Sequence, residues 1–192
     1  MPDPARCPWC GTDPLYVHYH DTEWGVPLRE PRALWECLIL EGFQAGLSWI
    51  TILRRRETFR AAFHGFHPEV IAGWGEPEIL RLLADPGIIR HRGKIEATIA
   101  GAAAYLRIEA KTGFSTFIWG HADPATPPLA TMANAPAQTP QSVALSRSLK
   151  AEGFKFCGPT ITYAFMQAAG LVNDHLTTCP RHDQVASLAL RP

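Results

Sequence analysis

The sequence predicts an all-α fold. Apolar side chains recur every three or four positions over 31–63 and 94–109, which places them on one face of a helix. The alternation of apolar and polar residues that is typical of a half-buried strand never persists for long. No internal repeat is visible in the chain. We therefore expect a set of helices that share one core, joined by loops.

Turn-forming residues set the limits of the predicted helices. Gly42 and Gly46 interrupt the pattern over 31–63, so two helices with a tight break near 44–48 are expected there. Gly153 closes another helix, and Pro159 suits the first position of the one that follows. Beyond the first two, helices are expected at about 77–84, 94–109, 142–152 and 159–170.

Loops are expected in three further stretches. The N-terminal segment is loop-rich in this interpretation, because it carries few periodic apolar positions. Residues 113–140 are rich in Pro, Ala and Thr and should run over the surface, with one short turn at 117–119. The tail, residues 180–192, is expected to form a short helix or a disordered segment.

Size and composition favour one domain over residues 1–192. The 18 basic and 18 acidic side chains balance, which gives no global signature of a nucleic-acid binder but allows a local basic patch. No apolar run reaches the roughly 18 residues that cross a membrane, and the N-terminus lacks a secretory signal. We expect a cytoplasmic protein without a membrane partner. Five cysteines, an odd number, indicate free thiols or metal ligands rather than disulfides.

The segment 87–93, GIIRHRG, predicts a tight hairpin between two helices, entered and left by glycine. Such a turn can direct backbone N–H groups at a phosphate, and the N-terminus of the next helix adds partial positive charge. Arg90, His91, Arg92 and Lys94 would supply cations beside it. A solvated turn between packed helices is the alternative.

An aromatic and acidic group comprises Tyr16, Tyr19, Trp24, Glu41 and Trp49. A carboxylate amid apolar residues on a predicted helix is costly unless it finds a partner. That partner could lie in the protein itself, in a buried polar contact. It could instead be a ligand, because aromatic faces stack on a flipped base and a carboxylate accepts its exocyclic N–H. A purine methylated at a ring nitrogen is cationic, which favours the same surroundings.

Soft metal ligands occur near both ends of the chain. Cys7, His20, His175 and Cys179 together offer two thiolates and two imidazoles, the donor set of a closed tetrahedral zinc site. A local alternative joins Cys7 and Cys10, in a CxxC spacing, to His18 or His20. Buried thiols and histidines without any metal are a further alternative.

The segment QAGLS, residues 44–48, lies at the expected break between two helices. Small residues there would let a backbone approach closely, and Leu47 could enter a base step as an apolar wedge. An ordinary helix break with a buried leucine is the alternative.

Taken together, these segments resemble the DNA-3-methyladenine glycosylase I family of the helix-hairpin-helix superfamily. The resemblance lies in four stretches that occur in the same order between Arg6 and Cys179: RCPWCGTDPLYVHYHDTEWGVP, LEGFQAGLSWITILRRRE, GIIRHRGKI and GFKFCGPTITYAFMQAAGLVNDH. It implies a helix-hairpin-helix glycosylase fold whose terminal segments, near 7–20 and 175–179, are clasped by one structural zinc ion. The implied zinc ligands are Cys7, His20, His175 and Cys179.

The resemblance also implies a base pocket and a DNA-binding surface. Glu41 would be the central catalytic residue and would hydrogen-bond the purine edge, within a pocket made with Tyr16, Tyr19 and Trp49. The residues implied to contact DNA are Gly46 and Leu47 at the gap left by the flipped base, and Arg90, Arg92 and Lys94 on the hairpin.

The function that follows is a monofunctional glycosylase, expected as a monomer, that excises 3-methyladenine from alkylated double-stranded DNA and leaves an abasic site. Methylation at N3 makes the base a good leaving group, so flipping and selection matter more than strong acid or base chemistry. One alternative is a Schiff-base nucleophile at Lys94, which would also cut the strand. The other is a zinc-stabilised protein that binds damaged DNA without catalysis.

Overall fold

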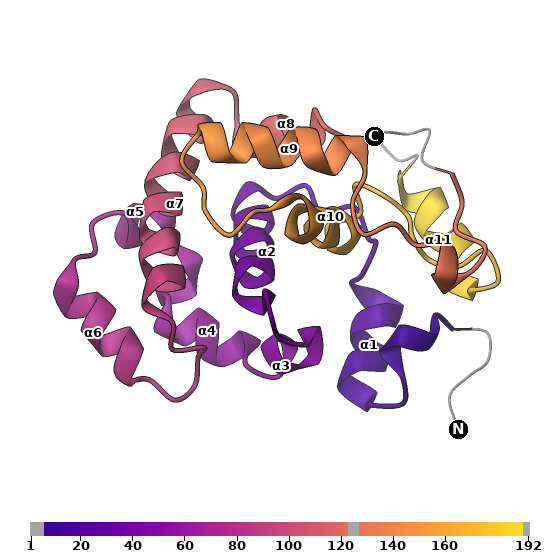
Figure 1. Ribbon diagram of the computed structural model, residues 1–192, viewed down its shortest axis with the longest axis horizontal. Helices are drawn as coiled ribbons and strands as arrows, with labels where there is room; N and C mark the ends of the chain where they lie inside the picture. Colours follow the sequence, from indigo (N-terminus) through magenta and orange to yellow (C-terminus); the bar gives the residue numbers. More distant parts are fainter. Residues whose placement is uncertain (1–5, 123–126, 190–192) are drawn as a thin grey trace.

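The computed structural model describes residues 6–122 and 127–189, and every regular element in them is a helix (Figure 1). This confirms the all-α prediction. The α-helices are α1 (Pro14–Thr22), α2 (Pro31–Gln44), α3 (Trp49–Leu53), α4 (Arg56–Ala62), α5 (Pro68–Ile71), α6 (Glu76–Ala84), α7 (Arg92–Lys111), α8 (Phe114–Trp119), α9 (Pro140–Ala151), α10 (Pro159–Ala168) and α11 (Pro180–Ala189). Three short 3-10 turns are η1 (Pro8–Cys10), η2 (His64–Phe66) and η3 (Met132–Asn134).

Several predicted helices are confirmed, with small shifts at their ends. α6, α7, α9 and α10 occupy the expected stretches, and α9 begins with the expected kind of cap, since the Thr139 side chain accepts from the N–H of Ser142 at 3.1 Å. The expected break after α2 is present, with Gly46 at φ +85°. The tail forms the helix α11 as far as the structure describes it.

Other expectations were wrong. The stretch 31–63 holds three helices rather than two, because the chain leaves helical geometry at Arg55 (φ −105°, ψ 1°) between α3 and α4. The N-terminal segment is not loop-rich: Pro14 opens α1, and the Asp13 carboxylate accepts the N–H groups of Leu15 and Tyr16. The short helix α5 was not predicted, and α8 is a helix of six residues where a turn was expected. Residues 123–126 of the expected surface segment lie outside the described residues.

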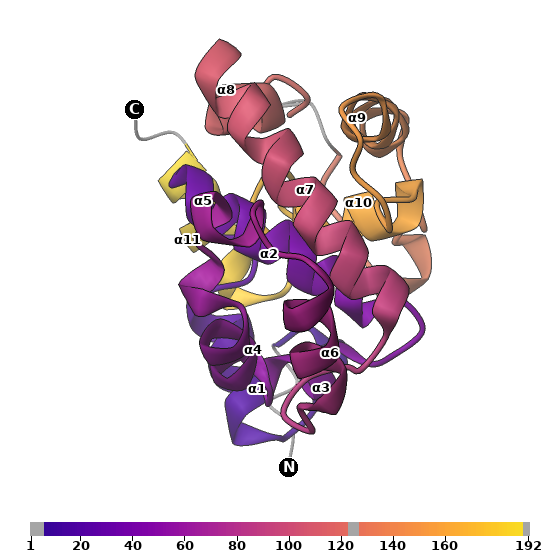
Figure 2. The same cartoon turned by 90° about the vertical axis from the view of Figure 1, so that its left-hand side faces the viewer.

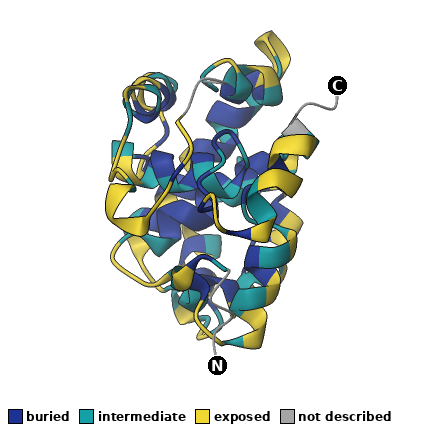
Figure 3. Cartoon of the chain, turned by 90° about the vertical axis from the view of Figure 1, so that its right-hand side faces the viewer, coloured by how far each residue is buried: buried dark blue, intermediate teal, exposed yellow. Residues whose placement is uncertain are grey.

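The core forms around α2, which contacts α3, α7, α8 and α10. Leu34, Trp35, Leu38 and Phe43 of α2 are buried, and the Phe43 ring contacts two further phenylalanines, one in α4 and one directly after it. In Figure 2 the long α7 crosses the molecule between α5 and the pair α9 and α10. Figure 3 shows the buried residues gathered inside and the exposed ones on the outer helix faces. α2 is therefore anchored in the core along its length, and this packing fixes the position of the residues at its C-terminal end.

The two ends of the chain meet on one side of the molecule. α1 and α11 both lie on the right in Figure 1, and an isolated bridge pairs Leu129 with Leu176. A second, small core cluster joins these segments: Cys7, Leu129, Leu176 and Cys179. Among the described residues, no helix is both long and apolar enough to cross a membrane.

Candidate functional site

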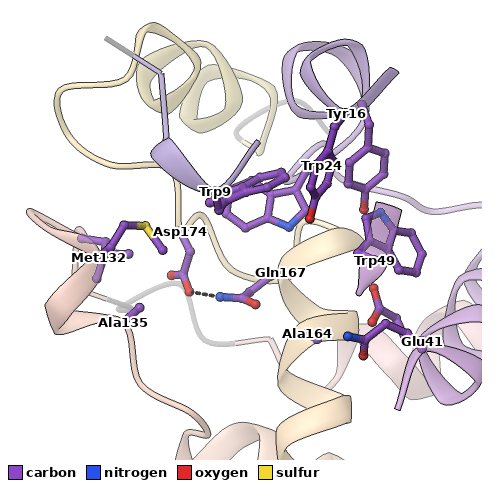
Figure 4. Close-up of a pocket in the computed structure, with 13 residues that line it drawn as sticks. Trp9, Tyr16, Trp24, Glu41, Trp49, Met132, Ala135, Ala164, Gln167 and Asp174 are labelled. Carbon is purple, nitrogen blue, oxygen red and sulfur yellow. Dashed lines mark hydrogen bonds between the residues drawn. The ribbon is translucent and has the colours of Figure 1, made fainter. Parts of the chain in front are cut away.

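A cavity of about 240 Å³ opens where α1, α2, α3 and α10 converge (Figure 4). Its walls combine aromatic rings with a few polar side chains, the composition expected of a small-molecule site. The lining residues are Trp9, Tyr16, Tyr19, Trp24, Glu41, Gln44, Trp49, Leu129, Met132, Ala135, Ala164, Gln167 and Asp174. All five members of the aromatic and acidic group singled out from the sequence therefore line one cavity.

Glu41 projects into this cavity from the last turn of α2 (Figure 4). The residue is only 4% exposed, and no described residue forms a hydrogen bond or ion pair with its carboxyl group. Burial raises the pKa of Glu41 from 4.5 to about 8, since a charged carboxylate is poorly solvated there. A buried acid without a protein partner is expensive, which favours a ligand as its partner over the internal polar contact.

Aromatic rings from several segments of the chain form the walls of the cavity. The rings of Tyr19 and Trp49 lie 5.5 Å apart between centroids, and those of Trp9 and Tyr16 lie 5.1 Å apart. Burial, followed by the nearby Glu41, raises the pKa of Tyr16 to about 12 and that of Tyr19 well above its usual value. Both phenols are therefore neutral at physiological pH and keep an O–H that can donate. The indole N–H of Trp49 is buried without a hydrogen-bond partner among the described residues.

Of the lining residues that the sequence analysis did not assign to the pocket, four are aromatic or polar: Trp9, Gln44, Gln167 and Asp174. Asp174 is 4% exposed and accepts a hydrogen bond from the Tyr163 hydroxyl at 2.5 Å. It also accepts one from the Gln167 amide at 2.7 Å (Figure 4). Polar residues inside the apolar run around α10 were the available signal for Gln167 and Asp174. Nothing comparable marks Trp9, which η1 brings to the cavity.

The second constellation also assembles. Cys7, His20, His175 and Cys179 are all buried, and the four potential ligand atoms lie within 4.8 Å of one another. Their separations include 3.7 Å from Cys7 Sγ to His175 Nδ1 and 3.6 Å from Cys179 Sγ to His20 Nε2. Edges of this length fit a tetrahedron of two sulfur and two nitrogen ligands around a zinc ion.

The outer shell of this cluster also suits a metal. His20 Nδ1 lies 2.7 Å from Asp21 Oδ1, and His175 Nε2 lies 3.0 Å from the Trp24 carbonyl oxygen. Partners of this kind fix the tautomer, and each ring thereby directs its other nitrogen to the centre. Cys10 stands outside the cluster, because its thiol donates to the Cys7 carbonyl at 3.2 Å. His18 is exposed, so the local CxxC alternative is not the one that the geometry assembles.

The predicted hairpin links α6 to α7, although Arg92 and Gly93 already belong to α7. The Asp85 carboxylate accepts the N–H of Gly87, and the Thr58 hydroxyl donates to the Gly87 carbonyl, so the turn is tied at its entrance. Arg90 is exposed and forms no ion pair or side-chain hydrogen bond with any described residue. The Arg92 guanidinium, by contrast, pairs with Glu76 and Glu96.

One hairpin assignment needs correction. Lys94 is not a surface cation: it is 7% exposed, and its Nζ donates to the carbonyl oxygens of Phe43 and Ala45, each at 2.9 Å. It does not line the aromatic cavity, so it is placed neither to contact a phosphate nor to attack a sugar. The sequence alone could not separate a basic residue on the exposed face of the hairpin from one on its inner face.

The QAGLS segment forms an open turn between α2 and α3. Gly46 adopts φ +85°, in the left-handed region that favours glycine, and no atom would contact an added Cβ within 4 Å. Leu47 is 41% exposed, which excludes the buried leucine of the alternative interpretation. The Gln44 amide donates to the Leu47 carbonyl at 2.7 Å and holds the turn. The exposed leucine thus lies on the short turn that joins Glu41's helix to Trp49's helix.

Comparison with known proteins bears on this arrangement directly. Residues 9–182 match the sequence profile described as methyladenine glycosylase. The chain belongs to the methyladenine glycosylase family. The match spans every constellation described above except Cys7, which lies just before it. The family resemblance expected from the sequence is confirmed.

Individual relatives agree over nearly the whole chain. The chain is 51% identical over 177 residues to "DNA-3-methyladenine glycosylase 1" of Escherichia coli (strain K12), across 91% of this chain and 95% of that protein. A crystal structure of 3-methyladenine DNA glycosylase I is similar with a TM-score of 0.90 and 52% identity, covering 92% of this chain and 99% of that one. A Tyr-to-Phe variant of 3-methyladenine DNA glycosylase I in complex with 3-methyladenine gives a TM-score of 0.87 and 39% identity, covering 92% and 97%.

Proposed function

We propose that this member of the methyladenine glycosylase family is a monofunctional DNA glycosylase that flips 3-methyladenine out of the duplex and releases it by hydrolysis. The observation that carries the proposal is Glu41, a buried carboxyl group that has no partner in the described part of the chain and faces a cavity walled by aromatic rings. Stacking on the rings and a hydrogen bond from the exocyclic amine to Glu41 would satisfy both features at once. The relatives named for this activity, one of them in complex with 3-methyladenine, support it.

The lesion supplies much of the reactivity. When the N9–C1′ bond breaks, its electron pair remains with the base and neutralises the charge that methylation introduced. Neutral 3-methyladenine leaves, water adds to C1′, and one proton goes to solvent, so an abasic site remains. Unmodified adenine carries no such charge and keeps a stronger bond, which makes flipping and charge selection the main tasks of the protein.

Glu41 provides the charge selection. Because burial raises its pKa to about 8, it is mostly protonated in the free protein at pH 7. A cationic base beside it favours the ionised form, since an opposite charge within a few ångströms stabilises a carboxylate. Binding of the cation is therefore accompanied by loss of the Glu41 proton, and a neutral purine gains no such stabilisation.

A structural zinc ion is the second part of the proposal. Cys7, His20, His175 and Cys179 would hold it, and four protein ligands leave no open position for water or substrate. Its role would be to fix the terminal segments that carry Trp9 and Trp24, two walls of the cavity.

Duplex DNA would lie across the hairpin and the QAGLS turn. Leu47, exposed on that turn, suits the position of a wedge at the vacated base step, with Gly46 beside it to admit the backbone. Arg90 and, once released from its carboxylates, Arg92 would contact phosphates. We further propose that the chain acts as a monomer, which sedimentation in solution would check.

Two competing functions are less well supported. A Schiff-base mechanism at Lys94 needs a free amine in the cavity, whereas this ammonium group is bonded to two backbone carbonyls outside it. A borohydride-trapped adduct with methylated DNA would revive that mechanism. A damage binder without catalysis would retain methylated DNA and release no base.

The test is release of free bases from methylated duplex DNA, separated by chromatography. We expect 3-methyladenine in the soluble fraction and an intact strand with an abasic site. Binding of the DNA without free base, or a strand break without added alkali, would overturn the proposal. The same chromatogram reports any other alkylated purine that is released.

A further inference from the structure

We propose that Lys94 is a positioning residue that couples the hairpin, residues 87–93, to Glu41 and to the QAGLS turn, residues 44–48, called the wedge turn below because it carries Leu47. This inference rests on the proposed function. It assigns Lys94 to neither phosphate contact nor covalent chemistry. Its ammonium group instead joins the first turn of α7 to the last turn of α2, two segments about fifty residues apart in sequence.

The contacts are those of a helix cap. Phe43 lies in the last turn of α2 and Ala45 directly follows that helix, so no later N–H of the helix bonds their carbonyl oxygens. Lys94 Nζ donates to both at 2.9 Å, and a cation at a helix C-terminus also interacts favourably with the helix dipole. The turn after α2 is therefore held from the hairpin side as well as by the hydrogen bonds between Gln44 and Leu47 within it.

Phe156 closes the same junction from a third segment. Its ring centroid lies 5.8 Å from Lys94 Nζ, within range of a cation–π contact, and 5.8 Å from the ring of His91 in the hairpin. Phe156 has φ +52°, in a region that non-glycine residues rarely adopt, and is nevertheless 38% exposed. A partly exposed phenylalanine with a strained backbone, next to a buried ammonium group, indicates a specific contact among three segments.

This contact lies between two residues with proposed functional roles. Glu41 lies two residues before Phe43 on the cavity side, and Leu47 lies two residues after Ala45 on the exposed side. A shift of the hairpin on the DNA backbone is thus transmitted to the wedge and to the carboxyl group through one side chain. Misplacement of a reacting group by about 1 Å can lower a rate on the order of a hundredfold.

Lys94→Met tests this link, because Met fills a similar volume and removes the donor. Lys111→Met, at the exposed far end of the same helix, is the matched control. We expect Lys94→Met to excise 3-methyladenine from duplex DNA about tenfold to a hundredfold more slowly, with a smaller loss on single-stranded methylated DNA, where no stacked partner must be replaced. Affinity for free 3-methyladenine, followed by tryptophan fluorescence, should change much less than the duplex rate.

A double-mutant cycle with Leu47→Ala separates coupling from general damage. If Lys94 acts through the wedge turn, the two losses on duplex DNA will be less than additive. Additive losses, an equal loss on duplex, single strand and free base, or an unchanged duplex rate would each overturn the inference. Should Lys94→Met fail to fold, Phe156→Leu provides the same cycle with a milder change. Failure of the wild-type protein to release any base would instead refute the proposed function.

Discussion

The aromatic cavity and the Cys/His cluster share a wall, but the imidazoles of the cluster have polar partners whereas the Glu41 carboxyl group in the cavity has none that the structure describes. In the cluster, each imidazole has a second partner: Asp21 for His20 and the Trp24 carbonyl for His175. In the cavity, the carboxyl group of Glu41 has no protein partner among the described residues. Saturated polar groups hold one geometry, whereas an unsatisfied buried group waits for a ligand. The contrast supports the proposals of a structural role for the cluster and of base recognition for the cavity.

The two regions are nevertheless connected through two tryptophans. Trp9 lies 5.3 Å from the His20 ring, and Trp24 lies 4.7 Å from the His175 ring, while both indoles line the cavity. Loss of a cluster ligand should therefore also disturb the walls of the cavity. The reverse is not expected, because Glu41 contributes no ligand atom to the cluster.

The largest effect is expected from loss of a cluster ligand. Cys179→Ala should abolish metal binding and lower the free energy of unfolding by more than about 4 kcal/mol, because a metal site is lost. Cys10→Ala is the matched control: this thiol is buried beside the cluster but outside it, so one zinc per chain should remain. Metal analysis and thermal unfolding measure both outcomes. One zinc per chain in Cys179→Ala, or wild-type stability, would contradict the structural role.

Glu41→Gln comes next and should act on function rather than on stability. The amide keeps the shape but loses the charge, so excision of 3-methyladenine should fall on the order of 10- to 100-fold, as expected for one charge-assisted hydrogen bond. Glu36→Gln on the same helix is the control, since Glu36 pairs with Arg60 away from this cavity. Single-turnover excision rates compare the two variants. Equal rates and equal base affinity in Glu41→Gln and wild type would remove Glu41 from the mechanism.

The pH dependence of stability sharpens the same contrast. The folded pKa of Glu41, about 8, lies above its ordinary value of 4.5, so the folded state binds more protons than the unfolded state between these values. This contribution to stability is complete below about pH 4.5 and is lost as the pH rises through 8. Urea unfolding at about pH 5 and about pH 8.5 should show a larger decline for wild type than for Glu41→Gln. Parallel declines would mean that Glu41 is already ionised in the free protein.

The two regions also differ in how far the sequence predicts them. Residue types marked Cys7, His20, His175 and Cys179 as possible ligands but left a local CxxC site open, and the family resemblance implied the long-range set. Tyr16 was singled out because its segment is rich in aromatic and polar residues but poor in aliphatic ones, and Glu41 because a carboxylate amid apolar residues is unusual. Trp9 and Asp174 were not, since their contribution depends on how η1 and the loop after α10 fold back on α1.

Lys94 shows a different limit of sequence reasoning. A basic residue in a basic turn predicts a solvent-exposed cation, and the periodicity of α7 does not contradict that interpretation. Only the packing of α7 against the end of α2 turns the side chain inward, to two carbonyl oxygens. The helices themselves were predictable because local spacing and caps specify them, whereas this contact is specified by tertiary structure alone.

The smallest expected effect concerns two arginines of the hairpin. They differ in the same respect as the cluster and the cavity: one has protein partners and the other has none among the described residues. Arg90 has no partner among the described residues, whereas Arg92 pairs with Glu76 at 2.7 Å and Glu96 at 3.3 Å. Arg90→Ala should weaken duplex binding a few-fold and reduce the slope of log affinity against log salt by about 0.9, as for one lost phosphate contact. Arg92→Ala should change the slope less, because its carboxylates compete with phosphate. Equal slopes for Arg90→Ala and wild type would place the DNA backbone elsewhere on the protein.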